Sequence, residues 1–510
     1  MNMISIRELS FEYPSGTRAL KSISLDIPEG AFVLLCGASG CGKSTLLRLM
    51  KQGLAPRGKV SGSVQYFGED MRDIPSKTAA EDIGFVMQSP ESQIVTDKVW
   101  HELAFSLESI GAQQQDMRRR VGEMASYFDL ESRLSENTAT LSGGQKQLLA
   151  LASAAAVHPK LLLLDEPTSQ LDPISARNLI EAITRLNRDH GVTVIIAEHR
   201  LEELLCVSDR IIVMDSGSII ADCSPRDICK ALPEKHPMAA AMPVSVRLFA
   251  MGGGKENAPL TIREGRNNAV CRDTMEKLPP ASAAESADTA EPVITAKELW
   301  VSYRKGADVL SSASVTVRKG KVLAILGSNG SGKTTLLKCL LGAIKPLGGR
   351  IKRKKGAVVA YLPQEPCELF TCETVREELA GDTSALIPES LYDSHPYDLS
   401  GGEQQRLAIA KLLSKNPDVL LMDEPTKGMD SHSKDALAKL LRELAYNGMA
   451  IVLVTHDTEL AAACADTCAM LSGGEIISED SPSVFFSENY FYTTAARRLT
   501  RGIRNGIITI

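Results

Sequence analysis

The sequence lacks a long apolar run, a paired cysteine pattern and an excess of positive charge, and each absence excludes a class of protein. The longest nearly continuous apolar run covers residues 148–157, which is too short to cross a bilayer. The eleven cysteines lack the paired spacing of zinc modules, and their usage indicates a reducing cytosol. A net charge of −6 argues against non-specific nucleic-acid binding, so we expect no nucleic-acid partner. The first residues enter a strand-like segment without a basic start or cleavage site, which predicts no secretory signal peptide.

An internal repeat is present instead. Tyr13 precedes Lys43 by 30 positions, and Tyr303 precedes Lys333 by the same 30 positions. Both members of the second pair follow those of the first by 290 positions. A length of 510 residues is enough for about three average domains, so two copies of one unit fit the chain.

Each copy alternates short β-branched or Leu-rich runs with amphipathic stretches, which predicts an α/β fold with a mostly parallel sheet. Buried strands are expected at 31–36, 161–164 and 192–197, with counterparts at 322–326, 419–422 and 450–454. We predict a first domain at 1–230, a flexible linker at 231–292, a second domain at 293–485 and a basic tail at 486–510. The linker prediction depends on residues 250–299, which contain no aromatic residue and are rich in Gly, Pro and Ala.

A glycine-rich loop stands between a predicted strand and a predicted helix in each copy. The loops read Gly37-Ala-Ser-Gly-Cys-Gly-Lys43-Ser44 and Gly327-Ser-Asn-Gly-Ser-Gly-Lys333-Thr334. Glycines let backbone amides curl around a polyphosphate, and the helix amino terminus adds partial positive charge. The lysines are expected to reach the terminal phosphates, and Ser44 and Thr334 offer a hydroxyl to Mg²⁺. Two such matches make a chance Gly-rich turn a poor explanation.

A pair of acidic residues ends a Leu-rich strand behind each loop. The pairs are Asp165-Glu166 and Asp423-Glu424. The first acid of each pair can hold Mg²⁺ through water, and the second can orient or deprotonate the attacking water. We therefore predict Asp165 and Asp423 as metal residues, and Glu166 and Glu424 as general bases.

The most specific motifs are Leu141-Ser-Gly-Gly-Gln145 and Leu399-Ser-Gly-Gly-Glu403, each of which precedes a helix. Ser and two glycines at a helix start provide a second anion site. Together with the loops and acid pairs, these signatures resemble the nucleotide-binding domains of ABC-type ATPases with a P-loop NTPase fold. The resemblance covers nearly all of both repeats and implies a helical subdomain in each.

The resemblance implies roles for further residues. Tyr13 and Tyr303 match the aromatic residue that stacks on adenine, and His199 and His456 match the switch histidine that contacts the γ-phosphate. Gln88 and Gln364 match the glutamine loop, which senses magnesium and meets the membrane partner. The expected ATP contacts are Tyr13, Gly37, Ser39, Gly40, Gly42, Lys43, Ser44, Thr45, Gln88, Ser142, Gly143, Gly144, Gln145, Tyr303, Gly327, Asn329, Gly330, Gly332, Lys333, Thr334, Thr335, Gln364, Ser400, Gly401, Gly402 and Glu403. The expected metal residues are Ser44, Gln88, Asp165, Thr334, Gln364 and Asp423, and the expected catalytic residues are Lys43, Lys333, Glu166, Glu424, His199 and His456.

In the family the two domains pack head to tail as a dimer, here an intramolecular pseudo-dimer. One composite ATP site is then expected to pair Lys43 with residues 400–403, and the other Lys333 with residues 142–145. Leu171-Asp172 and Met429-Asp430 match the loop that communicates across that interface. The first signature helix has Leu148 where the family has Arg, which the second copy keeps as Arg406. Neither this departure nor Glu403 in place of Gln removes a catalytic group, so two hydrolytic sites are expected.

The segment after Gln88 narrows the resemblance. Residues 88–97, followed by Val99-Trp-His-Glu-Leu-Ala104, look like the ATPase of energy-coupling factor transporters, which import vitamins or transition-metal ions in prokaryotes. This implies an integral membrane scaffold, a small membrane substrate-binding subunit, and a peripheral location on the cytoplasmic face of the cell membrane. The stretch from Gln88 to Ser142 spans 54 positions, but the stretch from Gln364 to Ser400 spans 36, which predicts a shortened second helical subdomain.

Three other ABC systems are alternatives. Sugar importers also use fused cassettes, but their second phosphate loop is typically degenerate, whereas residues 327–334 are intact. Ribosome-associated ABC ATPases usually carry a long charged helical linker, whereas residues 250–299 are rich in Pro, Ala and Gly. DNA-repair members carry zinc modules, and the cysteine spacing of such modules is absent from this sequence. The tail at 486–510 is basic and partly amphipathic, and a solvated helix face is a simpler interpretation than contact with anionic lipid or the scaffold.

Overall fold

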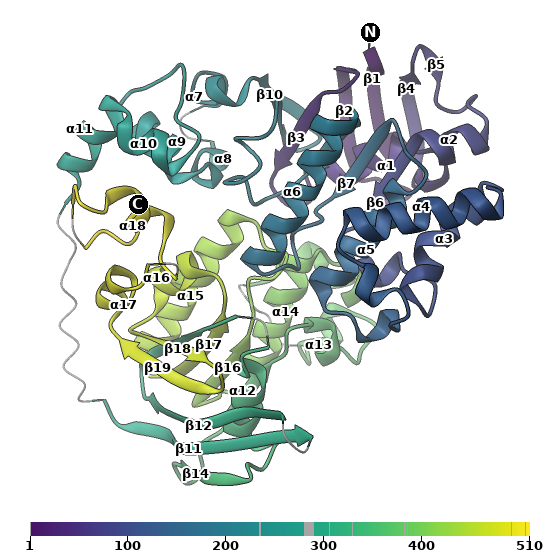
Figure 1. Cartoon of the computed structure of the whole chain (residues 1–510). Coiled ribbons are helices and arrows are strands. Elements are labelled where there is room, and N and C mark those ends of the chain that lie inside the picture. Colours follow the sequence, from purple (N-terminus) through teal and green to yellow (C-terminus); the bar gives the residue numbers. More distant parts are fainter. Residues whose placement is uncertain are drawn as a thin grey trace. The chain divides into compact units, whose positions relative to one another are not determined.

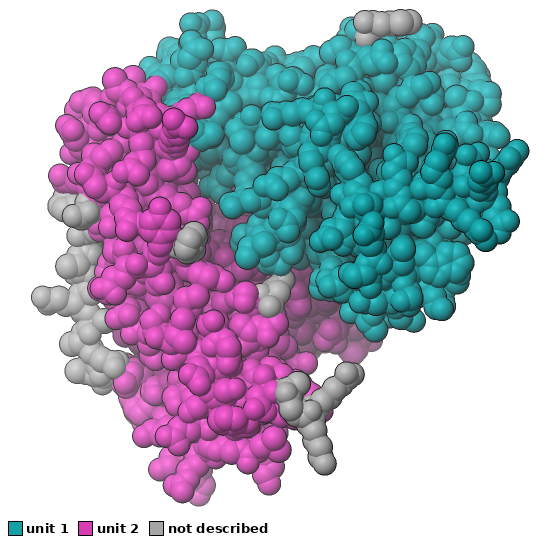
Figure 2. Space-filling model, in the orientation of Figure 1, with its two compact units in different colours: residues 1–261 teal, residues 262–510 magenta. Residues whose placement is uncertain are grey.

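The computed structural model describes residues 2–233, 236–279, 290–304, 307–328, 330–381, 384, 386–490, 492–504 and 506–510. The chain divides into two compact units, Met1–Thr261 and Ile262–Ile510 (Figure 2). Within the described residues, each unit combines a six-stranded sheet and a smaller antiparallel sheet with flanking helices (Figure 1). The predicted α/β fold in two tandem units is therefore confirmed.

The large sheet of the first unit has the strand order β10-β9-β3-β8-β7-β6. Its strands are β3 (Phe32–Gly37), β6 (Ile83–Val86), β7 (Leu161–Asp165), β8 (Thr193–Ala197), β9 (Arg210–Asp215) and β10 (Ser218–Cys223). All pairs are parallel except β9 with β10. β3, β6, β7 and β8 are buried along their whole length, which is why they read as continuous apolar runs in the sequence.

The second unit repeats this topology in the order β15-β16-β17-β13-β18-β19. Its strands are β13 (Val322–Leu326), β15 (Val359–Leu362), β16 (Val419–Asp423), β17 (Ala450–Thr455), β18 (Thr467–Ser472) and β19 (Glu475–Asp480). Only β18 and β19 pair antiparallel. The predicted strands thus occupy the same sheet positions in both copies.

The smaller antiparallel sheets have the orders β2-β1-β4-β5 and β12-β11-β14. Their strands are β1 (Asn2–Glu12), β2 (Arg18–Pro28), β4 (Lys59–Tyr66) and β5 (Glu69–Asp70), and β11 (Pro292–Arg304), β12 (Ala307–Arg318) and β14 (Gly348–Arg353). In each unit an apolar core joins this sheet to the large one. Tyr13 directly follows β1, and Tyr303 lies near the end of β11.

The helices of the first unit are α1 (Lys43–Leu49), α2 (Ser76–Asp82), α3 (Val99–Ser109), α4 (Gln114–Tyr127), α5 (Gly143–Ala155), α6 (Pro173–His190), α7 (Ile228–Ala231), α8 (Pro237–Ala241) and α9 (Val244–Met251). Those of the second unit are α10 (Ile262–Asn267), α11 (Ala269–Lys277), α12 (Lys333–Leu341), α13 (Val375–Glu378), α14 (Gly401–Leu413), α15 (Ser431–Tyr446), α16 (Thr458–Cys464), α17 (Pro482–Glu488) and α18 (Ala495–Thr500). None of the helices in the described ranges is long and apolar enough to span a membrane.

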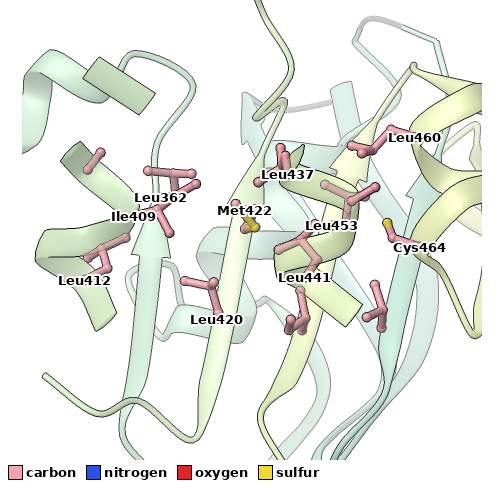
Figure 3. Packing of buried hydrophobic residues seen from close by; sticks show 14 of the residues in the cluster. Leu362, Ile409, Leu412, Leu420, Met422, Leu437, Leu441, Leu453, Leu460 and Cys464 are labelled. Carbon is pink, nitrogen blue, oxygen red and sulfur yellow. The ribbon is translucent and has the colours of Figure 1, made fainter. Parts of the chain in front are cut away.

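A second apolar core in the second unit covers the other face of its large sheet. Figure 3 shows Ile409 and Leu412 of α14, and Leu437 and Leu441 of α15, pointing toward the strand residues Leu362, Leu420, Met422 and Leu453. This packing fixes the start of α14, where the second signature stands, relative to the end of β16, where Asp423 stands.

The two copies differ between the glutamine loop and the signature. In the described residues, α3 and α4 fill this stretch of the first unit, whereas the corresponding stretch of the second unit holds the four-residue helix α13 and short 3₁₀ turns. The shorter stretch of the second unit therefore has no counterpart of α4 among the described residues.

The segment predicted as a flexible linker is largely folded up to residue 277. Helices α8 to α11 lie within it, and Phe249, Cys271 and Met275 are buried. Residues 280–289 lie outside the described residues. The composition was misleading because single apolar side chains on several short helices provide enough burial for packing without an aromatic cluster.

The tail is also packed rather than solvated. Ala496, Leu499 and Thr500 of α18 are buried, and α18 lies beside α10 (Figure 1). The interpretation of the tail as a solvated helix face is therefore wrong for these positions, because its apolar side faces α10 and its neighbours.

Candidate active sites

Each phosphate loop turns directly into a helix through a glycine in the left-handed region. Gly42 caps α1 with φ of 105°, and Gly332 caps α12 with φ of 101°. A Cβ at Gly42 would lie 2.5 Å from the carbonyl oxygen of Ala19, and one at Gly332 would lie 2.7 Å from that of Val309. Glycine is therefore required both for the conformation and for the close approach to the neighbouring strand.

The loop lysine of the first unit is buried and surrounded by acceptors. Lys43 Nζ donates to the carbonyl oxygens of Gly37 at 3.0 Å and Ala38 at 3.2 Å. It also lies 3.3 Å from His199 Nε2 and 3.7 Å from Glu166 Oε1. The sequence predicted that these three functional groups would meet, and the fold brings them together at the ends of β3, β7 and β8.

The predicted metal residues of the first unit are adjacent. Ser44 Oγ donates to Asp165 Oδ1 at 2.7 Å, and Arg48 lies 3.9 Å from Asp165 Oδ2. Burial raises the pKa of Asp165, while the hydrogen bond from Ser44 opposes that rise. A hydroxyl and a carboxylate therefore stand together beside the phosphate loop.

Glu166 has an unusual backbone conformation for a non-glycine residue, with φ of 47°. Its N–H donates to the carbonyl oxygen of Ala197 at 2.9 Å, which ties the strained residue to β8. Its carboxylate lies 2.7 Å from His199 Nε2 and accepts a hydrogen bond from Gln88 Nε2 at 3.0 Å. Strain of this kind accumulates at functional sites, where it directs a side chain toward the reacting groups.

The second unit repeats the cluster. Lys333 Nζ donates to the carbonyl oxygens of Gly327 at 2.9 Å and Ser328 at 3.0 Å, and lies 3.7 Å from Glu424 Oε1. Glu424 also has a positive φ, 48°, and its Oε2 lies 2.9 Å from His456 Nδ1. The histidine therefore approaches the glutamate through Nδ1 here and through Nε2 in the first unit.

Both predicted bases are held ionised. Burial alone would raise the pKa of Glu166, but the hydrogen bond from His199 and the charge of Lys43 outweigh it and lower the pKa. The pKa of Glu424 is lowered against burial in the same way by His456 and Lys333. Burial raises the pKa of Asp423, as it does for Asp165. In each unit the second acid of the pair is thus the one that is stabilised as an anion.

The signatures cap their helices in both units. Ser142 and Gln145 form a capping box at the start of α5, and Ser400 and Glu403 form one at the start of α14. The change from Gln to Glu therefore preserves the cap.

The remaining predicted contacts are only partly defined. Tyr13 and Tyr303 each place their hydroxyl near a threonine of the loop helix, at 2.9 Å from Thr45 Oγ1 and 3.2 Å from Thr335 Oγ1. Gln364 is exposed. Asn329 lies outside the described residues.

Two kinds of buried acid were missed by the sequence reasoning. Glu198, directly before His199, is buried and accepts hydrogen bonds from the N–H groups of Thr168 at 2.7 Å and His199 at 3.1 Å. Glu102 in α3 accepts hydrogen bonds from the N–H groups of Val95 and Thr96. Glu378 in α13 accepts in the same way from the N–H groups of Thr371 and Cys372. An acid immediately before the switch histidine was the available signal for Glu198. No signal in one sequence distinguishes Glu102 from a surface glutamate.

The residues fit a nucleotide-bound Mg²⁺ ion. Hydroxyl and carboxylate oxygens are its preferred ligands, and it is commonly held by one or two side chains together with substrate phosphates. Asp423 Oδ1 is buried and accepts no hydrogen bond from the described residues. Those residues contain no cluster of three or more His, Cys, Asp or Glu side chains that could bind a metal without such help.

Comparison with known proteins agrees with this geometry. A family model described as ABC transporter matches residues 20–169 and 310–427. A Bacillus thuringiensis protein named as an ABC transporter ATP-binding protein is 38% identical, with 97% of this chain and 95% of that protein covered. Similarly named proteins of Streptomyces coelicolor and Methanosarcina mazei are 35% and 32% identical, over 94% and 95% of this chain and 93% and 90% of their own lengths.

Solved structures of single cassettes each match part of the chain. CbiO1 of Clostridium perfringens, described as part of the ABC transporter complex cbiONQ, is 28% identical, with a TM-score of 0.41, and the match covers 44% of this chain and 90% of that one. A dimeric ATP-binding cassette bound to ADP and Pi in a post-hydrolysis state is 27% identical, with a TM-score of 0.40, covering 44% and 99%.

Proposed function

The chain belongs to the ABC transporter family as an ATP-binding protein with two fused cassettes, and from this premise we propose that it energises an energy-coupling factor importer. The cargo class is a vitamin or a transition-metal ion. The proposal depends on the first glutamine-loop segment, residues 88–104, whose sequence is typical of those ATPases. Its partners are then a membrane scaffold and a small membrane substrate-binding subunit, with this chain peripheral on the cytoplasmic face of a prokaryotic cell membrane.

The surface around that segment supports a partner there. Val95, Trp100 and Phe105 are all exposed, at 64%, 44% and 47%. They follow Gln88 in the sequence and lie in or next to α3. Large exposed apolar side chains concentrated in one short segment are a feature of interaction sites. We infer that α3 and the glutamine loop contact the scaffold, and that the second unit, with only α13 here, makes a different contact.

Hydrolysis is proposed at both clusters. Glu166 and Glu424 act as general bases that hold and deprotonate the attacking water, because each is ionised and fixed beside a phosphate loop. Lys43 and Lys333 neutralise negative charge that develops on the terminal phosphates, and His199 and His456 contact the γ-phosphate. Mg²⁺ supplies charge neutralisation between the phosphates when bound, beside Ser44 with Asp165 and Thr334 with Asp423.

Each loop lysine is already placed to receive ATP. Lys43 Nζ donates to two carbonyl groups of its own loop, and Lys333 does the same. An ammonium group has three donors, so one remains for a phosphate oxygen, with which it makes a strong charge-assisted hydrogen bond.

Each ATP is proposed to be sandwiched between units, with residues 400–403 covering the nucleotide on Lys43 and residues 142–145 covering that on Lys333. The capped starts of α5 and α14 present backbone amides and the positive end of a helix dipole to an anion. ATP then holds the two units together, and loss of the γ-phosphate lets them separate. The glutamine loops transmit that separation to the scaffold.

Single substitution of each base tests the hydrolytic proposal. We expect Glu166→Gln and Glu424→Gln each to reduce ATP turnover by at least about tenfold while ATP binding is retained, since a neutral amide cannot take the proton. Glu198→Gln is a control, because it changes a neighbouring buried acid that does not face Lys43. Unchanged turnover in either single base variant would refute hydrolysis at both sites.

A mild-detergent pull-down from the native cells tests the transport assignment. Recovery of a polytopic scaffold with a small integral membrane protein supports the energy-coupling factor importer. Recovery of sugar-importer permeases, of ribosomal proteins, or of no membrane protein would reject it in favour of the alternative ABC systems. A Trp100→Asp variant should lose the scaffold but keep ATP binding, because the substitution charges the apolar contact surface.

A further inference from the structure

A second candidate site lies outside the nucleotide clusters, in the part of the chain with least similarity to the repeats. Residues of α10 and α11 and residues after α18 line a cavity of about 660 Å³ in the second unit, which is open to solvent. The cavity is of the size that accepts a small molecule. It is lined by Ile262, Arg263, Arg266, Asn267, Arg272, Gly502 and Ile503.

The lining carries positive charge without compensation. Arg263, Arg266 and Arg272 contribute three guanidinium groups, and no lining residue is acidic. None of the three forms an ion pair with a carboxylate of the described residues. Gly502 and Ile503, which also line the cavity, belong to a sequence segment, 489–510, that contains four arginines and no Asp or Glu. Positive charge gathered in a concave surface raises the local concentration of anions.

Two of the arginines are held in place by backbone carbonyls. Arg266 Nη2 donates to the carbonyl oxygen of Arg501 at 2.6 Å, across 235 positions of sequence. Arg272 Nε donates to the carbonyl oxygen of Arg266 at 2.7 Å. A guanidinium has five N–H donors, so each of these groups is oriented by one bond and retains others for a ligand. Figure 1 shows α10, α11 and α18 grouped together in this region.

A buried arginine in α18, which is linked to the cavity through the backbone of Arg501, adds a separate observation. Arg497 is 9% exposed, and its Nε and Nη1 atoms have no hydrogen-bond partner in the described residues. Its carbonyl oxygen accepts from the N–H of Arg501, whose own carbonyl holds Arg266. Burial and the charge of Arg501 lower the pKa of Arg497. A buried cation among other cations is costly unless an anion compensates it.

We propose that this cavity binds a phosphate-bearing anion. Guanidinium groups bind phosphate oxygens through paired, charge-assisted hydrogen bonds, and a multiply charged phosphate compensates several arginines where one carboxylate cannot. A soluble phosphate compound and a phospholipid headgroup share this chemistry. Bound there, the anion ties the tail to α10 and therefore links residues before the second cassette to residues after it.

Binding is measured in a Lys43→Ala/Lys333→Ala background, which removes the lysines of both phosphate loops. Pyrophosphate is titrated by calorimetry, and vesicles of phosphatidylglycerol or phosphatidylcholine are tested by flotation. Arg263→Gln is the main variant because Arg263 lines the cavity and makes no hydrogen bond to the backbone of another described residue, and Arg272→Gln is the second. Arg350→Gln, at an exposed arginine of β14 in the same unit, is the charge-matched control. Circular dichroism checks that each variant is folded.

We expect pyrophosphate or phosphatidylglycerol vesicles to bind. The affinity should fall by about tenfold or more in Arg263→Gln and stay unchanged in Arg350→Gln. Pyrophosphate binding identifies a soluble phosphate as the ligand, and binding of phosphatidylglycerol alone identifies a headgroup. Binding of neither, or equal losses in Arg263→Gln and Arg350→Gln, overturns the proposal. ATP turnover is also measured for Arg263→Gln with both phosphate loops intact. Unchanged turnover shows that the cassettes still work, so that a loss of pyrophosphate or vesicle binding is a property of this site.

Discussion

Substitution of Lys411 by Met in α14 is expected to destabilise the second unit strongly. The side chain of Glu378 is completely buried, and it accepts hydrogen bonds from Lys411 Nζ and from the N–H groups of Thr371 and Cys372. Lys411 also donates to the carbonyl oxygen of Leu369 at 2.7 Å. Lys411→Met keeps the aliphatic stem but leaves a buried carboxylate without its cation.

The magnitude follows from that burial. Removing one partner of a buried ion pair typically costs about 3–5 kcal/mol, because the remaining charge is not compensated. For a unit of this size, 1 kcal/mol corresponds to about 2–4 °C in the midpoint of thermal unfolding. We therefore expect the transition of the second unit to fall by roughly 10 °C. Glu378→Gln/Lys411→Met should lose less than Lys411→Met, since no charge is then stranded.

The chain provides its own reporter for the assay. Of its two tryptophans, Trp100 lies in the first unit and Trp300 in the second. In a Trp100→Phe background, the tryptophan fluorescence therefore follows unfolding of the second unit alone. Lys354→Met is the control, because Lys354 pairs with Glu291 at the surface, where ion pairs contribute about 1 kcal/mol or less. A loss in Lys411→Met no larger than that in Lys354→Met would refute the reasoning.

Two further predictions concern pH and the phosphate loop. Burial would raise the pKa of Glu378, but the hydrogen bonds that its carboxylate accepts from Lys411 and the backbone lower that pKa below the ordinary 4.5. The ionised carboxylate therefore contributes stability above pH 4.5, and this contribution is lost as the pH falls through the pKa of the folded state. The unfolding free energies of wild type and Glu378→Gln, measured in urea, should converge in acid. Gly42→Ala should abolish binding of a fluorescent ATP analogue at the first loop and cost about 1–3 kcal/mol, because its Cβ meets Ala19 and its φ is positive. Gly122→Ala, in open space on α4, should be neutral or stabilising, and equal effects of the two changes would contradict the steric argument.

The sequence predicted the features whose residue types are dictated by local chemistry. The left-handed turn at Gly42 excludes other residues, and the parallel strands must be apolar throughout because both faces are covered. Lys43 and Glu166 were predicted from their motifs, and His199 was assigned to the γ-phosphate by the family resemblance. The three side chains can meet because the carboxyl ends of parallel strands lie at one edge of a sheet. The structure supports that grouping with distances below 4 Å.

The rest could not be predicted because it depends on contacts distant in sequence. The helices between residues 236 and 277 are short, and only tertiary packing of side chains such as Phe249 and Met275 stabilises helices of that length. The burial of Glu378 by Lys411 joins positions 33 apart, and neither residue belongs to a motif. Composition alone therefore suggested a linker where packing produces structure.

The two cassettes share their reacting groups but not the residues that support them. Asp423 accepts a hydrogen bond from Tyr361 at 3.3 Å, whereas the equivalent position on β6 is Phe85, which has no hydroxyl to donate. Lys411 compensates Glu378, whereas Ser153, equally 11 positions after its signature serine, donates a neutral hydroxyl to the carbonyl oxygen of Glu102 at 2.9 Å.

These supports act on the elements that must move during a cycle. The Glu378 ion pair joins α14 to the segment after Gln364, and in the first unit Lys146 of α5 pairs with Glu91, in the segment after Gln88, at 2.7 Å. Breaking the second pair strands a fully buried carboxylate, whereas Glu91 is 68% exposed, so we expect the second glutamine loop to be held more firmly to its signature helix. Any difference in turnover between Glu166→Gln and Glu424→Gln is then to be sought in these contacts and in the histidine, which approaches its glutamate through Nε2 in the first site and through Nδ1 in the second.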